Sequence, residues 1–152
     1  MKLISLSKGK FTKVDNEDFE NLSRFKWCIT NGYASRAIYG GGKRKFVYMH
    51  REILGVKKGV EIDHENLDKL DNQKRNLRSC NKFQNSYNTK IRSHNSSGFK
   101  GVIFEKCIQR FRARIRFNKR TISLGCYPTV EEAGEAYRIA VPLFHGKFGR
   151  VT

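Results

Sequence analysis

The sequence predicts an α+β protein built from small antiparallel sheets and short helices, and three observations support this class. Short runs of alternating apolar and polar residues recur along the chain and are typical of strands. Turn sequences, such as the glycine-rich stretch at 40–43, separate these runs. Only a few segments carry the spacing of an amphipathic helix. With 152 residues, we expect one domain or two small ones.

Residues 1–58 are predicted to form an α/β segment that packs on the unit after it. Asp15 or Asn16 can cap a short helix. The runs 33–39 and 44–50 are rich in aromatic and apolar residues, and the turn between them predicts a two-stranded hairpin. One face of the helix would carry Phe19, Leu22 and Phe25.

Residues 59–89 predict the order strand, loop, strand and helix. A short strand over 60–64 runs into a polar loop, and a second short strand follows over 76–80. Asn81 has a glutamine three residues later, which is the spacing of a capping box, and it predicts a helix over 81–89. The chain would therefore place its most polar loop between two strands and a helix.

Residues 99–152 predict a three-stranded antiparallel sheet packed on one helix. We expect strands over 99–104, 111–117 and 120–125. In the second of them, odd positions are apolar and even positions are arginine. Because successive side chains of a strand point to opposite faces, three guanidinium groups would share one face.

The helix of this C-terminal unit is expected to begin after Thr129. Thr129 and Glu132 have the spacing of a capping box. Pro142 should end or kink the helix, because proline lacks the backbone N–H of a helix interior. The apolar stripe of the helix would be Val130, Ala133, Ala136, Tyr137 and Ala140.

The charge of the chain predicts a polyanionic partner. Lys and Arg number 31 against 14 Asp and Glu, which gives a net charge of +17, and such self-repulsion is usually offset by a nucleic acid. The alternative is that the charge only keeps the protein soluble. Residues 90–98 are basic, rich in Ser and Asn and without periodicity, so they predict a linker. This linker would either lie along DNA or be a solvated hinge.

The cysteines and the hydropathy predict a soluble intracellular protein. Its four cysteines are scattered without a C-x-x-C pair, which disfavours a zinc ribbon or a disulfide framework. No apolar run approaches the roughly 18 residues of a membrane span. The N-terminus lacks the apolar core of a signal peptide. We therefore expect thiols in a reducing compartment and no membrane partner.

One constellation predicts a metal site with a general base. Asp63 and His64 are adjacent, and Asn76 and Asn85 follow at fixed distances. Carboxylate and amide oxygens suit a hard cation, so Asp63 and Asn85 are the candidate ligands of one Mg²⁺ or Mn²⁺ ion. An imidazole with a pKa near 6.5 suits a general base, and Asn76 is a candidate to orient it. Taken alone, each asparagine could instead be a turn, cap or solvated helix residue.

These residues resemble the HNH endonuclease motif, in the His-Asn-Asn version of phage and intron-associated homing nucleases. The resemblance implies a ββα finger around one divalent ion, with Asp63 and Asn85 as ligands and His64 as general base. Asn76 would fix either the loop or the imidazole. His50, Asn72 and Asn88 would support the site from outside the ligand set. The matching stretches are Ile62-Asp63-His64, Leu70-Asp71-Asn72, Asn76-Leu77-Arg78 and Gln84-Asn85-Ser86-x-Asn88.

The C-terminal unit resembles an AP2/ERF-type DNA-binding domain. The matching residues include Gly98-Phe99-Lys100-Gly101-Val102, Leu124-Gly125-x-Tyr127 and Glu131-Glu132-Ala133. The resemblance implies that the sheet enters the major groove while the helix packs behind it. Phe111 replaces the usual tryptophan of that family, and Ile103 replaces a frequent arginine. Carried over by position, with Arg112 added from the same face, the DNA contacts would be Lys100, Arg112, Arg114, Arg116, Thr121 and Ser123.

Together these features predict a metal-dependent endonuclease that hydrolyses phosphodiester bonds at preferred sites in double-stranded DNA. With one ion in one finger, the expected product of a monomer is a nick. The resemblance also implies a cytoplasmic phage or mobile-element protein in a bacterial host. Two alternatives stay open: a non-catalytic, sequence-specific DNA-binding regulator with a vestigial nuclease motif, and a basic RNA-binding or ribosome-associated protein.

Overall fold

The computed structural model describes residues 1–57 and 59–152, which form two compact units, Met1–Asn81 and Lys82–Thr152. Small antiparallel sheets and short helices make up both units, as expected for an α+β protein. The unit boundary lies inside the predicted 59–89 segment, and the predicted 90–98 linker belongs to the second unit. Lys58, the last residue of the predicted N-terminal segment, lies outside the described residues.

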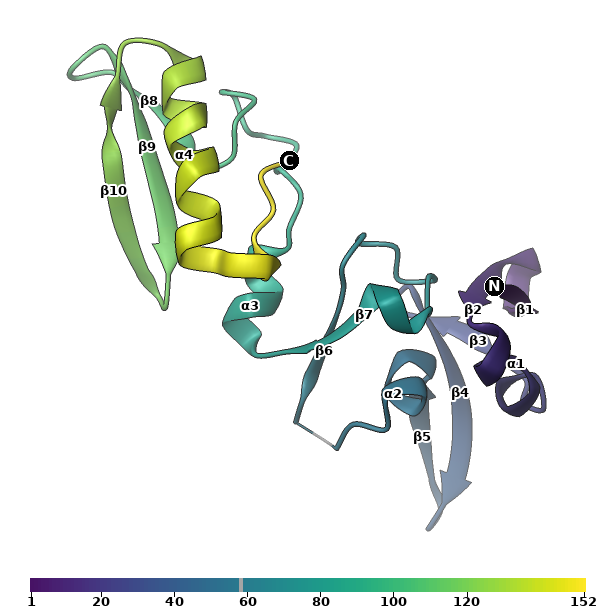
Figure 1. The fold of residues 1–152 in the computed structure, drawn as a ribbon. Coiled ribbons are helices and arrows are strands. Elements are labelled where there is room, and N and C mark those ends of the chain that lie inside the picture. Colours follow the sequence, from purple (N-terminus) through teal and green to yellow (C-terminus); the bar gives the residue numbers. More distant parts are fainter. Residues whose placement is uncertain (58) are drawn as a thin grey trace. The chain divides into compact units, whose positions relative to one another are not determined.

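The first unit contains three small antiparallel sheets, in the orders β1-β2, β3-β4-β5 and β6-β7 (Figure 1). Its core joins side chains from the first two sheets and from two helices, among them Val14, Trp27 and Met49. The elements are β1 (Lys2–Ser5), a 3₁₀ turn (Ser7–Gly9), β2 (Phe11–Val14), α1 (Asn16–Leu22), β3 (Cys28–Thr30), β4 (Tyr33–Gly40), β5 (Lys43–Tyr48), α2 (Met49–Leu54), β6 (Glu61–His64), a 3₁₀ turn (Lys74–Asn76) and β7 (Leu77–Cys80).

Several elements of this unit differ from the sequence prediction. The strands β1, β2 and β3 have only three or four residues each and carry too little periodicity to predict. Met49 and His50, predicted at the end of a strand, begin α2 instead, and Gly55 ends that helix with a φ of 59°. The first helix ends at Leu22, so Phe25 lies outside it.

The second unit is a three-stranded antiparallel sheet, in the order β10-β9-β8, packed on one helix. Ala113 and Ile115 of β9 are fully buried and contact the helix side chains Ala133, Tyr137 and Val141. The sequence predicts three strands and one helix here, and the structure contains them, although β8 begins at Val102 and not at residue 99. The elements are α3 (Lys82–Tyr87), β8 (Val102–Glu105), β9 (Arg110–Phe117), β10 (Arg120–Tyr127), α4 (Val130–His145) and a 3₁₀ turn (Gly146–Phe148).

The helix α4 begins where the sequence predicts and ends later. Thr129 Oγ1 accepts a hydrogen bond from the backbone N–H of Glu132 (3.3 Å), which is the expected cap. Pro142 does not end the helix, because the helix continues to His145. The buried side chains Val141 and His145 flank the proline and keep this last turn packed. No helix among the described residues is long and apolar enough to cross a membrane.

Candidate functional site

The candidate site lies where β6 ends. The strands β6 and β7 pair antiparallel, with Asp63 opposite Arg78 and His64 opposite Leu77. Asp63 and His64 are both buried, each 4% exposed. The polar loop begins directly after His64. A strand end is the place where two adjacent side chains can leave the alternation of the pleat and serve one site.

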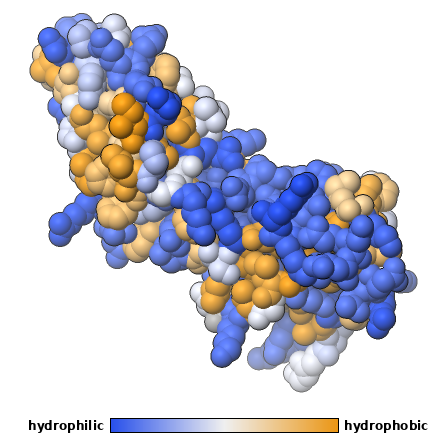
Figure 2. Space-filling view, in the orientation of Figure 1, coloured by the Kyte–Doolittle hydropathy of each residue, from blue (hydrophilic) through white to orange (hydrophobic). Residues whose placement is uncertain are grey.

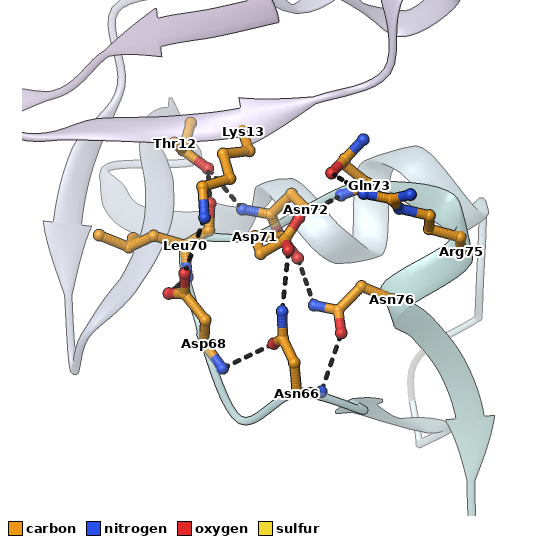
Figure 3. A network of polar contacts seen from close by, with 10 residues as sticks. All are labelled: Thr12, Lys13, Asn66, Asp68, Leu70, Asp71, Asn72, Gln73, Arg75 and Asn76. Atoms are coloured by element: carbon orange, nitrogen blue, oxygen red, sulfur yellow. Dashed lines mark hydrogen bonds and ion pairs between the residues drawn. The ribbon is translucent and has the colours of Figure 1, made fainter. Parts of the chain in front are cut away.

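Asn76 fixes the loop between β6 and β7 (Figure 3). Its Oδ1 accepts a hydrogen bond from the backbone N–H of Asn66 (2.9 Å), and its Nδ2 donates to the backbone carbonyl of Asp71 (2.7 Å). The Asn66 side chain also donates to Asp71 Oδ2 (2.8 Å). One buried amide therefore connects the start and the end of the loop. Of the two roles that the sequence left open for Asn76, loop fixation is the one its hydrogen bonds serve.

Asn72, rather than Asn76, lies against the imidazole of His64. The distance from His64 Nε2 to Asn72 Oδ1 is 3.3 Å. Asn72 is fully buried, and its Nδ2 donates to Thr12 Oγ1 (2.7 Å). Thr12 in turn donates to the backbone carbonyl of Leu70 (2.7 Å) (Figure 3). The prediction that Asn76 orients the imidazole is thus corrected, because a chain of polar contacts from β2 places Asn72 there.

This chain of contacts sets the chemistry of His64. Since Asn72 donates through its nitrogen to Thr12, its oxygen faces the imidazole, and His64 Nε2 must then carry the proton. In this tautomer Nδ1 is the basic nitrogen. Burial lowers the pKa of His64 below 6.5, against the opposing effects of Asn72 and nearby carboxylates. The imidazole is therefore neutral at neutral pH, which is the form required of a general base.

Asp63 is paired with Arg78 across the two strands. Arg78 Nη2 and Nε lie 2.7 and 2.9 Å from Asp63 Oδ2. Both contacts end on the same carboxylate oxygen. Arg78 was not among the residues predicted for the site. The expected pairing of β6 with β7 could have indicated Arg78, because Arg78 stands directly opposite Asp63 in this antiparallel pair.

Tyr33 and His50 lie against the imidazole of His64, and Tyr48 lies against His50. The ring centroids of Tyr33 and His50 lie 5.7 and 5.3 Å from that of His64. Tyr48 stacks on His50 at 5.6 Å. His50 Nδ1 is buried and has no hydrogen-bond partner among the described residues. Burial, with smaller effects of the charges on His64 and Arg51, lowers the pKa of His50 to about 4. His50 is therefore a neutral packing partner of the candidate base.

We expect this burial to make stability depend on pH. The unfolded chain protonates His50 near pH 6.5, whereas the folded protein does so only near pH 4. The contribution of the neutral ring is thus present above pH 6.5 and is lost as pH falls toward 4, by roughly 3 kcal/mol. In urea unfolding, His50→Phe should show a weaker loss of stability over this range. His94→Gln, at an exposed histidine, should behave like the wild type; equal pH dependence in all three proteins would contradict this assignment.

Asn85 and Asn88, the predicted amides after β7, fall in the second unit. Asn85 is on α3, and Asn88 follows directly after that helix. Asn88 is buried, and its Oδ1 accepts a hydrogen bond from Arg150 Nε (2.9 Å). The ring of Tyr87 stacks on His145 of α4 at 3.8 Å. The helix that carries Asn85 is thus anchored to the C-terminal sheet-and-helix unit, and the pairing of Asn85 with Asp63 stays a prediction.

The arginine face of β9 is present as the alternation predicts. Arg114 and Arg116 are exposed, and Thr121 and Ser123 of β10 stand directly opposite them in the strand register. Arg112 belongs to the same face, but its Nη1 lies 3.1 Å from Glu105 Oε2. Among the described residues, neither of the other two arginines has a carboxylate within ion-pair distance. We call Arg112, Arg114, Arg116, Thr121 and Ser123 the arginine face.

Lys100 does not belong to the arginine face, which corrects the prediction for this residue. Its ammonium donates to the backbone carbonyls of Tyr87, Thr89 and Arg150, at 3.0, 2.8 and 3.0 Å. Burial, followed by the charge of Arg150, lowers the pKa of Lys100 to about 8. All three donor positions of the ammonium are used within the protein. Lys100 therefore connects the end of α3 to the C-terminal tail.

Lys100→Met should destabilise the protein without a specific loss of DNA affinity. The substitution keeps the aliphatic stem but leaves three carbonyls without their donor, which should cost about 2–3 kcal/mol of unfolding free energy. Urea unfolding and DNA binding at one salt concentration would be measured side by side. Lys106→Met, at an exposed lysine of the same unit, is the matched control. Unchanged stability with selectively weakened DNA binding would restore Lys100 as a DNA contact.

The comparisons with known proteins give one distant relative. The chain is 27% identical over 150 residues to an uncharacterized HNH endonuclease of Acanthamoeba polyphaga mimivirus, a similarity that covers 96% of this chain and 76% of the relative. No protein-family model matches the chain. No solved structure matches it either. The similarity spans both units, and it agrees with the HNH resemblance seen in the sequence, whereas it says nothing of an AP2/ERF domain.

Proposed function

We propose that this protein is a metal-dependent HNH endonuclease that nicks double-stranded DNA at preferred sites. The observation that carries the proposal is the buried, neutral imidazole of His64, which Asn72 holds in one tautomer beside the carboxylate of Asp63. The distant HNH endonuclease relative supports the same class. A buried imidazole and carboxylate at the open end of a strand are better explained by proton transfer and ion binding than by core packing.

In this proposal His64 is the general base. Its Nδ1 takes a proton from the water that attacks the phosphodiester, while Nε2 keeps its own proton on Asn72. The contacts of Asn72 to Thr12 hold the ring against rotation. Asn76 keeps the loop after β6 in one conformation, so the imidazole and the Asp63 carboxylate remain next to each other. Tyr33 and His50 cover the ring and limit its hydration.

Asp63 and Asn85 are the proposed ligands of one divalent ion. One carboxylate and one amide are hard oxygen donors, which suit Mg²⁺ or Mn²⁺ with several retained waters. The described residues contain no group of three or more His, Cys, Asp or Glu side chains suited to a metal. We therefore propose an ion with two protein ligands, whose remaining ligands are water molecules. When bound, the ion would stabilise the charge that develops on the scissile phosphate. Arg78 would hold the Asp63 carboxylate in position through Oδ2.

The arginine face is the proposed DNA-binding surface of the second unit. Arg114 and Arg116 point away from the helix α4, and their charges are not offset by described carboxylates. Such guanidinium groups bind phosphates and base edges in DNA. The AP2/ERF resemblance favours the same face, with Thr121 and Ser123 beside the arginines. The net charge of +17 would strengthen binding to any duplex.

Supercoiled plasmid tests this proposal directly. With Mg²⁺ or Mn²⁺ the wild-type protein should convert supercoiled plasmid to the open circular form, and EDTA should stop the conversion. Mapping the nicks by primer extension would show whether they recur at preferred positions. Binding to DNA without any cleavage under these conditions would favour the non-catalytic alternative. Tighter binding to structured RNA than to duplex DNA at the same salt concentration would favour the RNA-binding alternative.

A further inference from the structure

We propose that the outer half of the β4–β5 ribbon is a second DNA-binding surface, which holds the duplex beside the bond that His64 cleaves. By the outer half we mean residues 38–46. This inference rests on the proposed endonuclease function, and it adds a contact region that neither the HNH motif nor the arginine face includes. The shape, the charge and the side-chain faces of the ribbon support it.

The ribbon projects beyond the other elements of the first unit (Figure 1). Its strands pair without interruption from Ser35 opposite Tyr48 to Gly40 opposite Lys43. The inner half is buried or half-buried, whereas residues 38–46 are exposed. No core side chain comes from this outer half. The outer half is therefore an arm that the fold of the first unit does not need for its core.

The arm is strongly basic. Lys43, Arg44 and Lys45 are consecutive and exposed. In the described part of the chain, no carboxylate lies within ion-pair distance of any of the three. Hydrophilic residues also form much of the first unit's surface on the face seen in Figure 2. Three neighbouring cations without acidic partners suit a polyanion and disfavour a protein partner that lacks acidic residues.

One face of the arm is also aromatic. Tyr39 is 79% exposed and Phe46 is 40% exposed. The guanidinium of Arg44 lies over the Phe46 ring at 4.7 Å. Because partners in an antiparallel register share a face, Tyr39, Arg44 and Phe46 lie on the same side of the ribbon as Tyr48. Interleaved aromatic and basic side chains of this kind can contact sugars, bases and phosphates.

The aromatic face of the ribbon extends to His64, the candidate base. Tyr48 stacks on His50, and Tyr33, on the same side of the ribbon, lies 5.7 Å from His64 between ring centroids. The aromatic and basic face is thus continuous, within one unit, from the imidazole to the tip of the arm. DNA whose scissile phosphate sits at His64 would extend along this face.

The dimensions fit duplex DNA. A two-stranded ribbon can enter the major groove, which is about 12 Å wide. The arm includes residues 43–46 of β5, and at about 3.3 Å per residue this stretch spans roughly 13 Å, or roughly four base pairs at about 3.4 Å each. We therefore expect the arm to contact a stretch of this length on one side of the nick.

A plainer explanation must be separated from this one. β5 is the edge strand of its sheet, and lysines on edge strands prevent pairing with other chains. In that case Lys43 and Lys45 would protect the edge, and their replacement would cause aggregation and leave DNA binding unchanged. Edge protection would explain Arg44 as well, which lies on the same strand, but it does not explain the exposed aromatic side chain of Tyr39 on β4.

The test replaces Lys43, Arg44 and Lys45 together by glutamine and measures affinity for a short duplex that contains one mapped nick site. The variant should lower the slope of log K against log salt by about 2–3 units. A matched control replaces Lys8, Lys10 and Lys26, three exposed lysines of the same unit, by glutamine. This control distinguishes an effect specific to the arm from the effect of losing any three positive charges. Size-exclusion chromatography would report aggregation.

A series of duplexes shortened from each end locates the contact. Wild-type affinity should fall when roughly four base pairs on one side of the nick are removed, and the arm variant should be insensitive to that removal. Equal affinity, salt slope and length dependence for the wild type and the arm variant would overturn the inference while DNA cleavage stands. Absence of DNA binding and nicking by the wild type would instead overturn the proposed function itself. Equal losses in the arm variant and the control would also overturn the arm's role.

Discussion

His64→Ala is expected to slow plasmid nicking by about 10²- to 10⁴-fold, the usual contribution of a general base. The alanine removes the imidazole that Asn72 holds in one tautomer, and no other described imidazole is placed to replace it. His50, the nearest one, has a pKa of about 4 and is packed between aromatic rings. Single-turnover rates at saturating Mn²⁺ would be compared with those of the wild type.

Two controls make this result specific. His94→Ala removes an exposed histidine and should leave the rate unchanged. Urea unfolding should show that His64→Ala is folded, and DNA affinity should stay near that of the wild type, because the substitution changes no basic residue that binds phosphate. A nicking rate for His64→Ala within a few fold of the wild type would remove His64 from the mechanism. An equal drop in DNA affinity and in nicking would indicate a binding role instead.

Arg114→Gln combined with Arg116→Gln is expected to weaken DNA binding by roughly a hundredfold. It should also lower the salt slope by about 2 units, because each arginine that neutralises a phosphate contributes about one unit to the slope. Arg112→Gln should have a smaller effect than either single substitution, since Arg112 is already paired with Glu105. Fluorescence anisotropy with a labelled duplex over a salt series would measure both quantities.

The control for the arginine face is a second variant of equal charge. Lys8→Gln with Lys10→Gln removes two exposed positive charges from the other unit. It should lower affinity less than the arginine variant does, because it changes only the overall electrostatic field of the protein. Equal losses in the two variants would mean that net charge, rather than the arginine face, determines binding.

Local periodicity explains which parts of the structure the sequence could predict. The alternation around Arg114 placed β9 and its two faces correctly, since a strand periodicity is visible within a few residues. Asp63 and His64 were expected at a strand end, and β6 does end at His64. The cap at Thr129 was predicted from a motif of four residues.

The remaining features depend on contacts between distant residues. Thr12 is 60 residues from Asn72, so no local pattern shows that the two hold the imidazole. Lys100 has the position of a DNA contact in the sequence, but three carbonyls from other segments capture its ammonium. Met49 continues a strand-like run, yet its full burial in the core of the first unit accompanies the start of a helix there.

The central claim is one divalent ion held by Asp63 and Asn85, with His64 as a separate base, and a Mn²⁺ titration of the single-turnover nicking rate tests it most directly. Asp63→Asn and Asn85→Ala should each raise the Mn²⁺ concentration for half-maximal rate. Their double variant should show less than the sum of the two effects in free energy, because both residues would serve the same ion. His64→Ala should lower the maximal rate and leave the half-maximal concentration unchanged. Nicking in EDTA, or an unchanged Mn²⁺ requirement in both ligand variants, would contradict the claim.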